Sequence, residues 1–207
     1  MSDTQSPVNI LIPFYSRDGH TEALAKAIAE GAQAEGATVK LRRAREIVSR
    51  EIMAKSPGWI ENADRMDALY EAPTPEDAEW ADGLIFGTPT RFGNISSELK
   101  SYVDSLGGLW FQGKLNGKAG SAFAATGSLH GGNESTPISM YNFMVHLGLI
   151  LVPLGYSDPA MFEAGTPYGA TTYSLNGNRE VSEQELAVAR HQGKRVTQIA
   201  RVLKTLR

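Results

Sequence analysis

Short apolar runs alternate with stretches of helical period along this chain, and such alternation predicts a parallel sheet covered by helices on both faces. Five runs have the length and apolar content of strands. They occupy residues 8–15, 39–41, 83–87, 118–126 and 149–154. We therefore expect an α/β fold of three layers, built on a doubly wound parallel sheet of five strands in the order 2-1-3-4-5.

Helix signals fit between these runs. The first strand breaks at residues 16–19, where a turn and a helix start coincide, and Gly36 is a natural helix stop. Ser182 and Glu185 form a capping-box pattern, which predicts a long closing helix that runs through Leu206.

Two stretches are longer than the connections that a minimal fold of this type requires. Residues from about 46 to 82 begin with basic side chains and end with acidic ones, and we interpret them as a solvated helical insertion whose opposed charges screen one another. An oligomer contact is the alternative. Residues 161–179 are rich in Gly, Thr, Tyr and Asn and should form a functional loop after the last strand. No linker or repeat divides the chain, so residues 1–207 should form a single domain.

The composition excludes several classes of chemistry. The 207 residues contain no cysteine, which rules out a disulfide framework, a cysteine-bound metal or cluster and a thiol nucleophile, so electron transfer would require a bound cofactor. A net charge of -3 argues against nucleic acid as the main partner. The first ten residues carry no basic region and no long apolar run, and no stretch reaches about 18 apolar residues. We expect a cytoplasmic protein without a secretory signal or membrane span.

The turn after the first strand carries groups suited to an anion. In an open parallel sheet, ligands bind at the carboxyl ends of the strands beside the point where the strand order reverses. The turn reads Ser16-Arg17-Asp18-Gly19-His20-Thr21, with two hydroxyls and a glycine at a helix start. Free backbone N–H groups there favour an anion by about 0.3–1 kcal/mol. Phosphate binding and a plain N-capped turn both fit this pattern.

The turns after the third and fourth strands offer room for a flat ring. The first, residues 88–94, combines a stiffening proline with hydroxyl, guanidinium and aromatic groups. The second, residues 126–133, has glycines that let the backbone approach a ligand closely. Either turn alone could be merely flexible. All three turns together predict a site for a phosphorylated mononucleotide with a planar heterocycle, and FMN is the first candidate.

Several motifs resemble those of the WrbA-type NAD(P)H:quinone oxidoreductases of the flavodoxin-like superfamily. The likeness covers nearly the whole chain. Its most specific stretches are Tyr15-Ser16 with Gly19-His20, Phe86-Gly-Thr-Pro-Thr-Arg-Phe-Gly-Asn94, Gly107-Gly-Leu-Trp110, Val152-Pro-Leu-Gly-Tyr156 and Gly165-Thr-Pro-Tyr-Gly-Ala-Thr-Thr172. The resemblance implies a flavodoxin-like fold.

The same resemblance implies a set of FMN contacts. The turn of residues 16–21 would hold the phosphate, residues 90–92 would flank the isoalloxazine edge, and residues 125–131 would contribute backbone contacts. The implied cofactor-binding residues are Ser16, Arg17, Asp18, Gly19, His20, Thr21, Pro89, Thr90, Arg91, Phe92, Gly93, Ala125, Thr126, Gly127, Ser128, Leu129, His130, Gly131 and His146. Without the resemblance, His146 would read as a core histidine.

Two further residues are implied to contact substrates. Trp110 would shape the pocket in which nicotinamide and quinone stack, although it also reads as a core or interface anchor. Asp18 stands where better-known members have a tyrosine that contacts the nicotinamide cofactor, so it could repel a second phosphate. The family forms homotetramers, which would place the loop of residues 165–172 near a neighbour's site.

The function implied by the resemblance is transfer of two electrons from NADH or NADPH to quinones by a ping-pong mechanism. No second nucleotide fingerprint exists in the chain, so both substrates would use one pocket. No side chain need be a catalytic acid and no metal is expected, because FMN carries the redox step and His20, His146 or water could supply protons. The alternatives are a flavodoxin-like electron carrier, and an FMN-binding interaction or regulatory module without turnover.

Overall fold

A computed structural model describes residues 7–207. It contains a parallel sheet in the order β2-β1-β3-β4-β5, which confirms the predicted order, and a sixth strand that pairs with β4. The strands are β1 (Val8–Phe14), β2 (Ala37–Arg43), β3 (Gly83–Pro89), β4 (Ala119–Thr126), β5 (Ile150–Leu151) and β6 (Thr171–Tyr173). The expectation of no secretory signal rests partly on residues 1–6, which lie outside the described residues.

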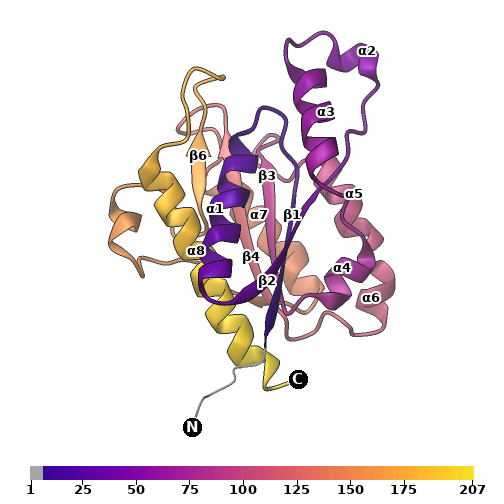
Figure 1. The fold of residues 1–207 in the computed structure, drawn as a ribbon, viewed down its shortest axis with the longest axis vertical. Helices are drawn as coiled ribbons and strands as arrows, with labels where there is room; N and C mark the ends of the chain where they lie inside the picture. The colour runs from indigo at the N-terminus through magenta and orange to yellow at the C-terminus, as the bar shows by residue number, and fades with distance from the viewer. Residues whose placement is uncertain (1–6) are drawn as a thin grey trace.

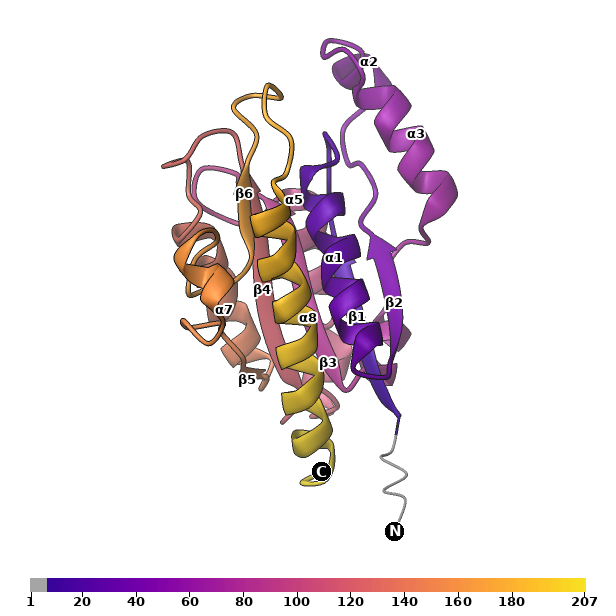
Figure 2. The ribbon, with the colours of Figure 1, turned by 60° about the vertical axis from the view of Figure 1, so that its left-hand side comes forward.

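Helices cover both faces of the sheet (Figures 1 and 2). They are α1 (His20–Ala34), α2 (Arg50–Met53), α3 (Trp59–Leu69), α4 (Pro75–Trp80), α5 (Ser97–Ser105), α6 (Gly107–Phe111), α7 (Ser135–His146), the short 3-10 helix η1 (Pro159–Phe162) and α8 (Glu183–Lys204). Among residues 7–207, no helix combines the length and the apolar character needed to traverse a lipid bilayer.

Side chains of β1 alternate between two hydrophobic cores. Ile10, Ile12 and Phe14 pack against α1 and α8 on one face, whereas Leu11 and Tyr15 pack with residues of α4, α5 and α7 on the other. This alternation follows from the two-residue period of a strand. It explains why the run at residues 8–15 is apolar except for Asn9, since a strand covered on both faces has no solvent side.

Helices α1 and α8 approach each other through two glycines. A Cβ atom on Gly193 of α8 would lie 1.9 Å from the carbonyl oxygen of Ile28, and one on Gly31 of α1 would lie 1.9 Å from that of Arg190. Neither backbone oxygen can move aside independently of its helix. The close side-by-side packing of the two helices therefore requires glycine, which has no Cβ atom, at both positions (Figure 2).

The fifth strand is interrupted, which corrects the prediction of one strand at residues 149–154 and a loop at residues 161–179. Residues 150–151 pair with the start of β4, and Thr171–Tyr173 return as β6 beside its end. The intervening residues leave the sheet, and Ser157 Oγ lies 2.8 Å from Nε2 of His191 on α8. The two short strands thus share one edge of β4 and extend the sheet toward its carboxyl end.

The predicted insertion at residues 46–82 holds three helices with different surroundings. Helix α4 packs on the sheet through Ala78, a member of the second core. Helices α2 and α3 instead project beyond the carboxyl ends of the strands (Figure 1). They share a small apolar cluster of their own, formed by Met53, Trp59 and Ala63.

Ion pairs attach α3 to the first turn of α1. The buried carboxylate of Glu22 accepts hydrogen bonds from Arg65 (2.5 Å) and from the Tyr70 hydroxyl (2.9 Å), and Lys26 lies 3.0 Å away. Burial alone would raise the pKa of this carboxyl, but these three donors outweigh it and lower the pKa of Glu22 from 4.5 to about 2. Charges of the insertion therefore act on the body of the protein as well as on one another.

The glycine contact between α1 and α8 predicts the effect of a single methyl group. Gly193→Ala should lower the free energy of unfolding by about 1–3 kcal/mol, because the helices must separate to admit the Cβ atom. Urea denaturation of the purified variant measures this loss. Gly107→Ala is the matched control, since no atom lies within 4 Å of a Cβ there, and equal stability of both variants would contradict the prediction.

The ion pairs of Glu22 predict a pH-dependent contribution to stability. Because the folded-state pKa lies below the unfolded value of 4.5, the stabilisation is present above about pH 4.5 and is lost as the pH falls toward 2. Glu22→Gln should be less stable than the wild type by about 2–3 kcal/mol at pH 7, and the gap should close in acid. Urea denaturation at pH 7, 5, 4 and 3 tests this, with exposed Glu51→Gln as the control. A difference in unfolding free energy between the wild type and Glu22→Gln that does not change with pH would contradict the lowered pKa of Glu22.

Candidate functional site

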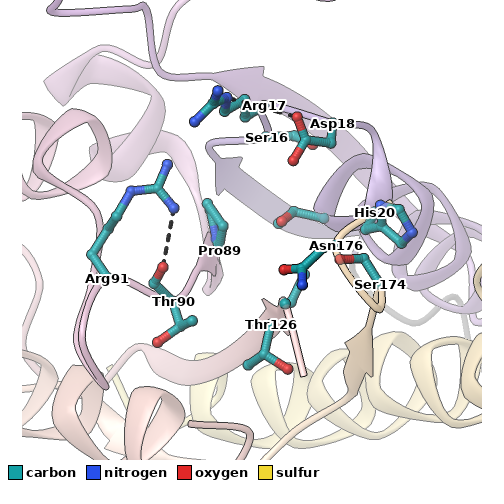
Figure 3. A pocket seen from close by; sticks show the side chains of 13 residues that line it. Ser16, Arg17, Asp18, His20, Pro89, Thr90, Arg91, Thr126, Ser174 and Asn176 are labelled. Carbon is teal, nitrogen blue, oxygen red and sulfur yellow. Dashed lines mark hydrogen bonds and ion pairs between the residues drawn. The ribbon is translucent and has the colours of Figure 1, made fainter. Parts of the chain in front are cut away.

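A cavity of about 170 Å³ opens at the carboxyl ends of β1, β3 and β4. Figure 3 shows its side chains converging from loops that are far apart in the sequence. The lining residues are Ser16, Arg17, Asp18, His20, Thr21, Pro89, Thr90, Arg91, Ala125, Thr126, Gly127, Ser174 and Asn176. Eleven of these thirteen belong to the set predicted from the sequence, so the three predicted turns do meet at one place.

The turn after β1 leaves the start of α1 without a side-chain cap. The buried Ser16 hydroxyl accepts the N–H of Gly19 at 3.1 Å, one residue before the helix, and Gly19 adopts a left-handed φ of 95°. Among residues 7–207, no side chain caps α1. Helices α2, α3, α6 and α7 also lack a side-chain cap, whereas Thr74, Ser96 and Ser182 cap α4, α5 and α8. The first amides of α1 thus have no side-chain acceptor, an arrangement that suits an anionic ligand.

A buried arginine, Arg43, holds this turn in place by a hydrogen bond to its backbone. The Arg43 guanidinium is fully buried and donates to the Ser16 carbonyl oxygen (3.2 Å), to Glu46 (2.6 Å) and to Asp67 (2.5 Å). The Tyr15 hydroxyl donates to the other oxygen of Glu46 at 2.7 Å. Burial and the Glu46 carboxylate raise the pKa of Tyr15 well above its usual range, so it remains a neutral donor. The turn is therefore held by charges that are themselves paired.

The loop after β3 presents an exposed aromatic ring beside the cavity. Arg91 and Asn94 exchange backbone hydrogen bonds of 2.9 and 3.1 Å across a tight turn. The turn places Phe92 at a φ of 54° and leaves its ring fully exposed. A bulky residue in this left-handed region is strained by roughly 1–3 kcal/mol. Phe92 and Gly93 do not line the cavity but form the tip of the loop next to it.

The loop after β4 turns away from the cavity directly after Gly127. The Thr126 hydroxyl donates to the Ser128 carbonyl oxygen at 2.7 Å and closes a tight turn. Ala125, Thr126 and Gly127 line the cavity, but Ser128 and Gly131 do not. Leu129 and His130 line a separate cavity of about 610 Å³. The structure therefore does not bring residues 128–131 to the expected place, because a glycine-rich composition does not specify where a loop turns.

Ser174 and Asn176 are lining residues that the sequence interpretation missed. They follow β6, and their N–H groups donate to the carbonyl oxygens of Thr126 (2.8 Å) and Gly127 (3.1 Å). This pairing carries the end of β6 to the cavity wall. The signal was present, since Thr171-Thr172-Tyr173 is a run with strand propensity and Asn176-Gly177 is a turn dipeptide.

The side chain of His20 has a defined protonation pattern. Its Nε2 atom lies 2.7 Å from the carbonyl oxygen of Arg179. A carbonyl can only accept, so Nε2 must carry a proton. The remaining nitrogen, Nδ1, is therefore the ring atom that carries the lone pair in the neutral imidazole.

Two predicted contacts, Trp110 and His146, lie far from the cavity of their own chain. His146 ends α7, four residues before β5, which pairs with the amino end of β4. Trp110 lies on α6, and the segments that follow α6 and α7 meet through a 2.9 Å bond from Gly117 N–H to the Gly148 oxygen. The eight residues of β4 span about 23 Å, so both side chains sit at the opposite end of the sheet. Motif resemblance alone does not specify how near a residue lies to the cavity of its own chain.

The donor set of the cavity fits a phosphate group. Hydroxyls of Ser16 and Thr21 and the uncapped amides of α1 supply hydrogen-bond donors. Asp18 is the sole carboxylate among the lining residues, against the cations of Arg17 and Arg91. A phosphorylated flavin therefore meets donors and positive charge here.

Comparison with known proteins agrees with this geometry. Residues 14–158 match the family described as NADPH-dependent FMN reductase. The chain is similar to a WrbA-like flavodoxin from Agrobacterium tumefaciens, with 27% identity, a TM-score of 0.66 and coverage of 94% of this chain and 98% of that one.

Two more distant structures share the fold. An archaeal flavodoxin has 17% identity and a TM-score of 0.59, with 95% of this chain and 99% of that one covered. RosB, solved with bound 8-demethyl-8-formylriboflavin-5'-phosphate, has 15% identity and a TM-score of 0.63, with 96% and 81% covered. The chain belongs to the NADPH-dependent FMN reductase family: it is a flavodoxin-like oxidoreductase with FMN as its cofactor and NAD(P)H as its electron donor.

Proposed function

We propose that the protein transfers two electrons from NAD(P)H to quinones, with both substrates using the same cavity in turn. The observation that carries this proposal is the meeting of an uncapped helix start and an exposed aromatic loop at one cavity, in a chain of the FMN reductase family. The sequence holds no second nucleotide fingerprint, so the nicotinamide has no separate binding domain to use. The motif resemblance to WrbA-type quinone oxidoreductases supports a quinone as the acceptor, and the likeness to a WrbA-like flavodoxin agrees with that resemblance.

The residues suggest how FMN would be held. The FMN phosphate would contact the turn of residues 16–21, and the backbone of residues 125–127 would lie beside the ribityl chain of FMN. A volume of about 170 Å³ is below the roughly 300–1,000 Å³ of pockets that enclose whole ligands, which favours a ring that lies at the mouth. Thr90, Arg91, Phe92 and Gly93 would then flank the ring, with the exposed Phe92 as its aromatic neighbour.

Bound FMN supplies the capacity to accept a hydride from NAD(P)H and pass two electrons to a quinone. The protein's own part is to orient the substrates and to manage protons. NAD(P)H would dock against the cavity mouth, leave as NAD(P)⁺, and give way to a quinone that departs as hydroquinone. Nδ1 of His20, or water in the open mouth, would deliver protons to the quinone oxygens.

Stopped-flow absorbance tests the proposed reaction. FMN-loaded protein mixed with NADPH or NADH should lose the oxidised flavin absorbance, and later addition of benzoquinone should restore it. Steady-state rates at several quinone concentrations should give parallel double-reciprocal lines, as expected for a ping-pong mechanism. A flavin band that neither nucleotide bleaches would favour the electron carrier or the interaction module instead.

We also propose that the chain forms a homotetramer in which a neighbour supplies Trp110 and His146 to each cavity. Both residues lie about 23 Å from the cavity of their own chain along β4, so they can reach one only from another subunit. Large apolar side chains are exposed around them, which supports burial in an interface. These side chains are Trp110, Phe111, Val145 and Ile150.

Subunit complementation tests this sharing of the site. Gly19→Val should disable the phosphate turn, because a β-branched residue does not adopt its left-handed φ, and Trp110→Ala should leave the cavity of its own chain intact. Each variant alone should have low quinone reductase activity. After subunit exchange, the mixture should regain activity, since hybrids contain an intact cavity beside an intact Trp110.

A mixture of two preparations of Gly19→Val serves as the control and should stay inactive. Light scattering on the wild type should give the mass of four chains. A fully active wild-type monomer, or no recovery in hybrids that are shown to form, would contradict the shared site.

A further inference from the structure

We infer that the guanidinium of Arg17, held in place by Trp59 of the insertion, binds a phosphate group of the incoming nicotinamide dinucleotide. This inference rests on the proposed use of one cavity by both substrates. It gives the projecting helices α2 and α3 a role in substrate recognition. Its starting point is a contact between two segments that are separated in the sequence by α1, β2 and α2.

The Arg17 side chain stacks on an aromatic ring. Its guanidinium carbon lies 3.8 Å from the centroid of the Trp59 ring, and Trp59 is almost fully buried in the small cluster of the insertion. Stacking uses one face of the guanidinium and leaves its N–H groups, which point outward in the plane, free to donate. The contact therefore fixes the position of the charge without consuming its hydrogen bonds.

Arg17 differs from the other arginines near the insertion in having no carboxylate hydrogen bond. Among residues 7–207, its Nε atom has no hydrogen-bond partner, and the Asp18 oxygen 3.8 Å away is beyond hydrogen-bond reach. By contrast, four neighbours each donate to a carboxylate: Arg43, Arg45, Arg50 and Arg65. With 31% of its side chain exposed beside the cavity and no carboxylate hydrogen bond, Arg17 can offer its terminal N–H groups to an anion.

Arg17 belongs to the turn of residues 16–21 that is proposed to hold the FMN phosphate, but its side chain points away from the uncapped start of α1. In Figure 3, its side chain extends away from His20 and Asn176, toward the side of the cavity where Arg91 lies. Among the described residues, the one hydrogen bond of the Arg91 guanidinium goes to the Thr90 carbonyl oxygen at 3.0 Å. Two guanidinium groups without carboxylate hydrogen bonds thus mark the side away from the uncapped start of α1.

Phosphate is the chemistry that these groups recognise best. A planar guanidinium matches the oxygens of a phosphate through two parallel N–H bonds. NADPH offers two sources, its diphosphate and its 2′-phosphate, and NADH offers the diphosphate alone. Asp18 weakens either interaction through its negative charge, so Asp18→Asn should tighten nucleotide binding about two- to threefold.

Calorimetry with NADP⁺ and NAD⁺ on the FMN-loaded protein tests the inference without turnover. Arg17→Met should weaken NADP⁺ binding about tenfold, as for the loss of a charge-assisted hydrogen bond to phosphate. An equal loss for NAD⁺ assigns Arg17 to the diphosphate, and a loss confined to NADP⁺ assigns it to the 2′-phosphate. Arg50→Met is the matched control, because it removes the same charge from an exposed side chain paired with Asp64 on the insertion and should change neither affinity.

The role of Trp59 as a positioning residue has its own test. Trp59→Leu should weaken NADP⁺ binding about threefold while retaining Arg17, and Trp59→Phe should recover most of the affinity because it preserves a ring for the stack. Circular dichroism and FMN affinity verify that each variant is folded.

Unchanged affinity in folded Arg17→Met overturns the inference, as does an equal loss in Arg50→Met or a wild type that binds neither nucleotide. If NADPH still reduces the wild type and a quinone still reoxidises it, the proposed function survives that failure. If the wild type binds NADP⁺ through Arg17 but a quinone is not reduced, the proposed function fails while this subsite stands.

Discussion

The site depends on a helix whose amino end is left without a side-chain cap. At α4, α5 and α8 a hydroxyl accepts the first free amides, but at α1 the Ser16 hydroxyl is used one residue earlier, on Gly19. The left-handed conformation of Gly19 makes this possible and directs the chain into the helix. The amides of the first turn are then available to a ligand, and the helix dipole favours an anion there. FMN, the cofactor of this family, carries such an anion.

The site keeps a positive electrostatic character because the nearby carboxylates of Glu22 and Glu46 are paired with basic side chains. Glu22, in the first turn of α1, is paired with Arg65 and Lys26, and Glu46 is paired with the buried Arg43. If these carboxylates were unpaired, they would oppose a phosphate at the same turn. The insertion supplies Arg65 and part of the Arg43 network, so it takes part in the electrostatics of the site as well as standing over it.

The sequence predicted the fold well, and it predicted that the three turns meet at one edge of the sheet, because both follow from local patterns. Apolar runs and glycine stops define the strands and α1, and the carboxyl edge of a parallel sheet is where its turns must meet. It failed where neighbouring strands decide the outcome. Thr171–Tyr173 form β6 by pairing with residues 124–126 at the carboxyl end of β4, a pairing between distant segments that no local pattern encodes. The loop after β4 turns at Ser128, where the Thr126 hydroxyl donates a hydrogen bond to the Ser128 carbonyl oxygen.

The positions of His146 and Trp110 show a different limit. Their neighbours in the sequence resemble a family motif, but a motif does not encode whether a contact comes from the same chain. The contact between Arg17 and Trp59 was equally invisible, because no periodic pattern links a turn to a helix more than thirty residues away. The distance of His146 and Trp110 from the cavity and the contact between Arg17 and Trp59 emerge only when the elements are placed in space.

A comparison of FMN with riboflavin tests the central claim most directly, because the two ligands differ only in the phosphate. Titration of the apoprotein followed by flavin fluorescence should show that FMN binds at least about tenfold more tightly than riboflavin, and Ser16→Ala should narrow this difference. Equal affinities for the two flavins would show that the turn of residues 16–21 does not hold the phosphate, and would contradict the account.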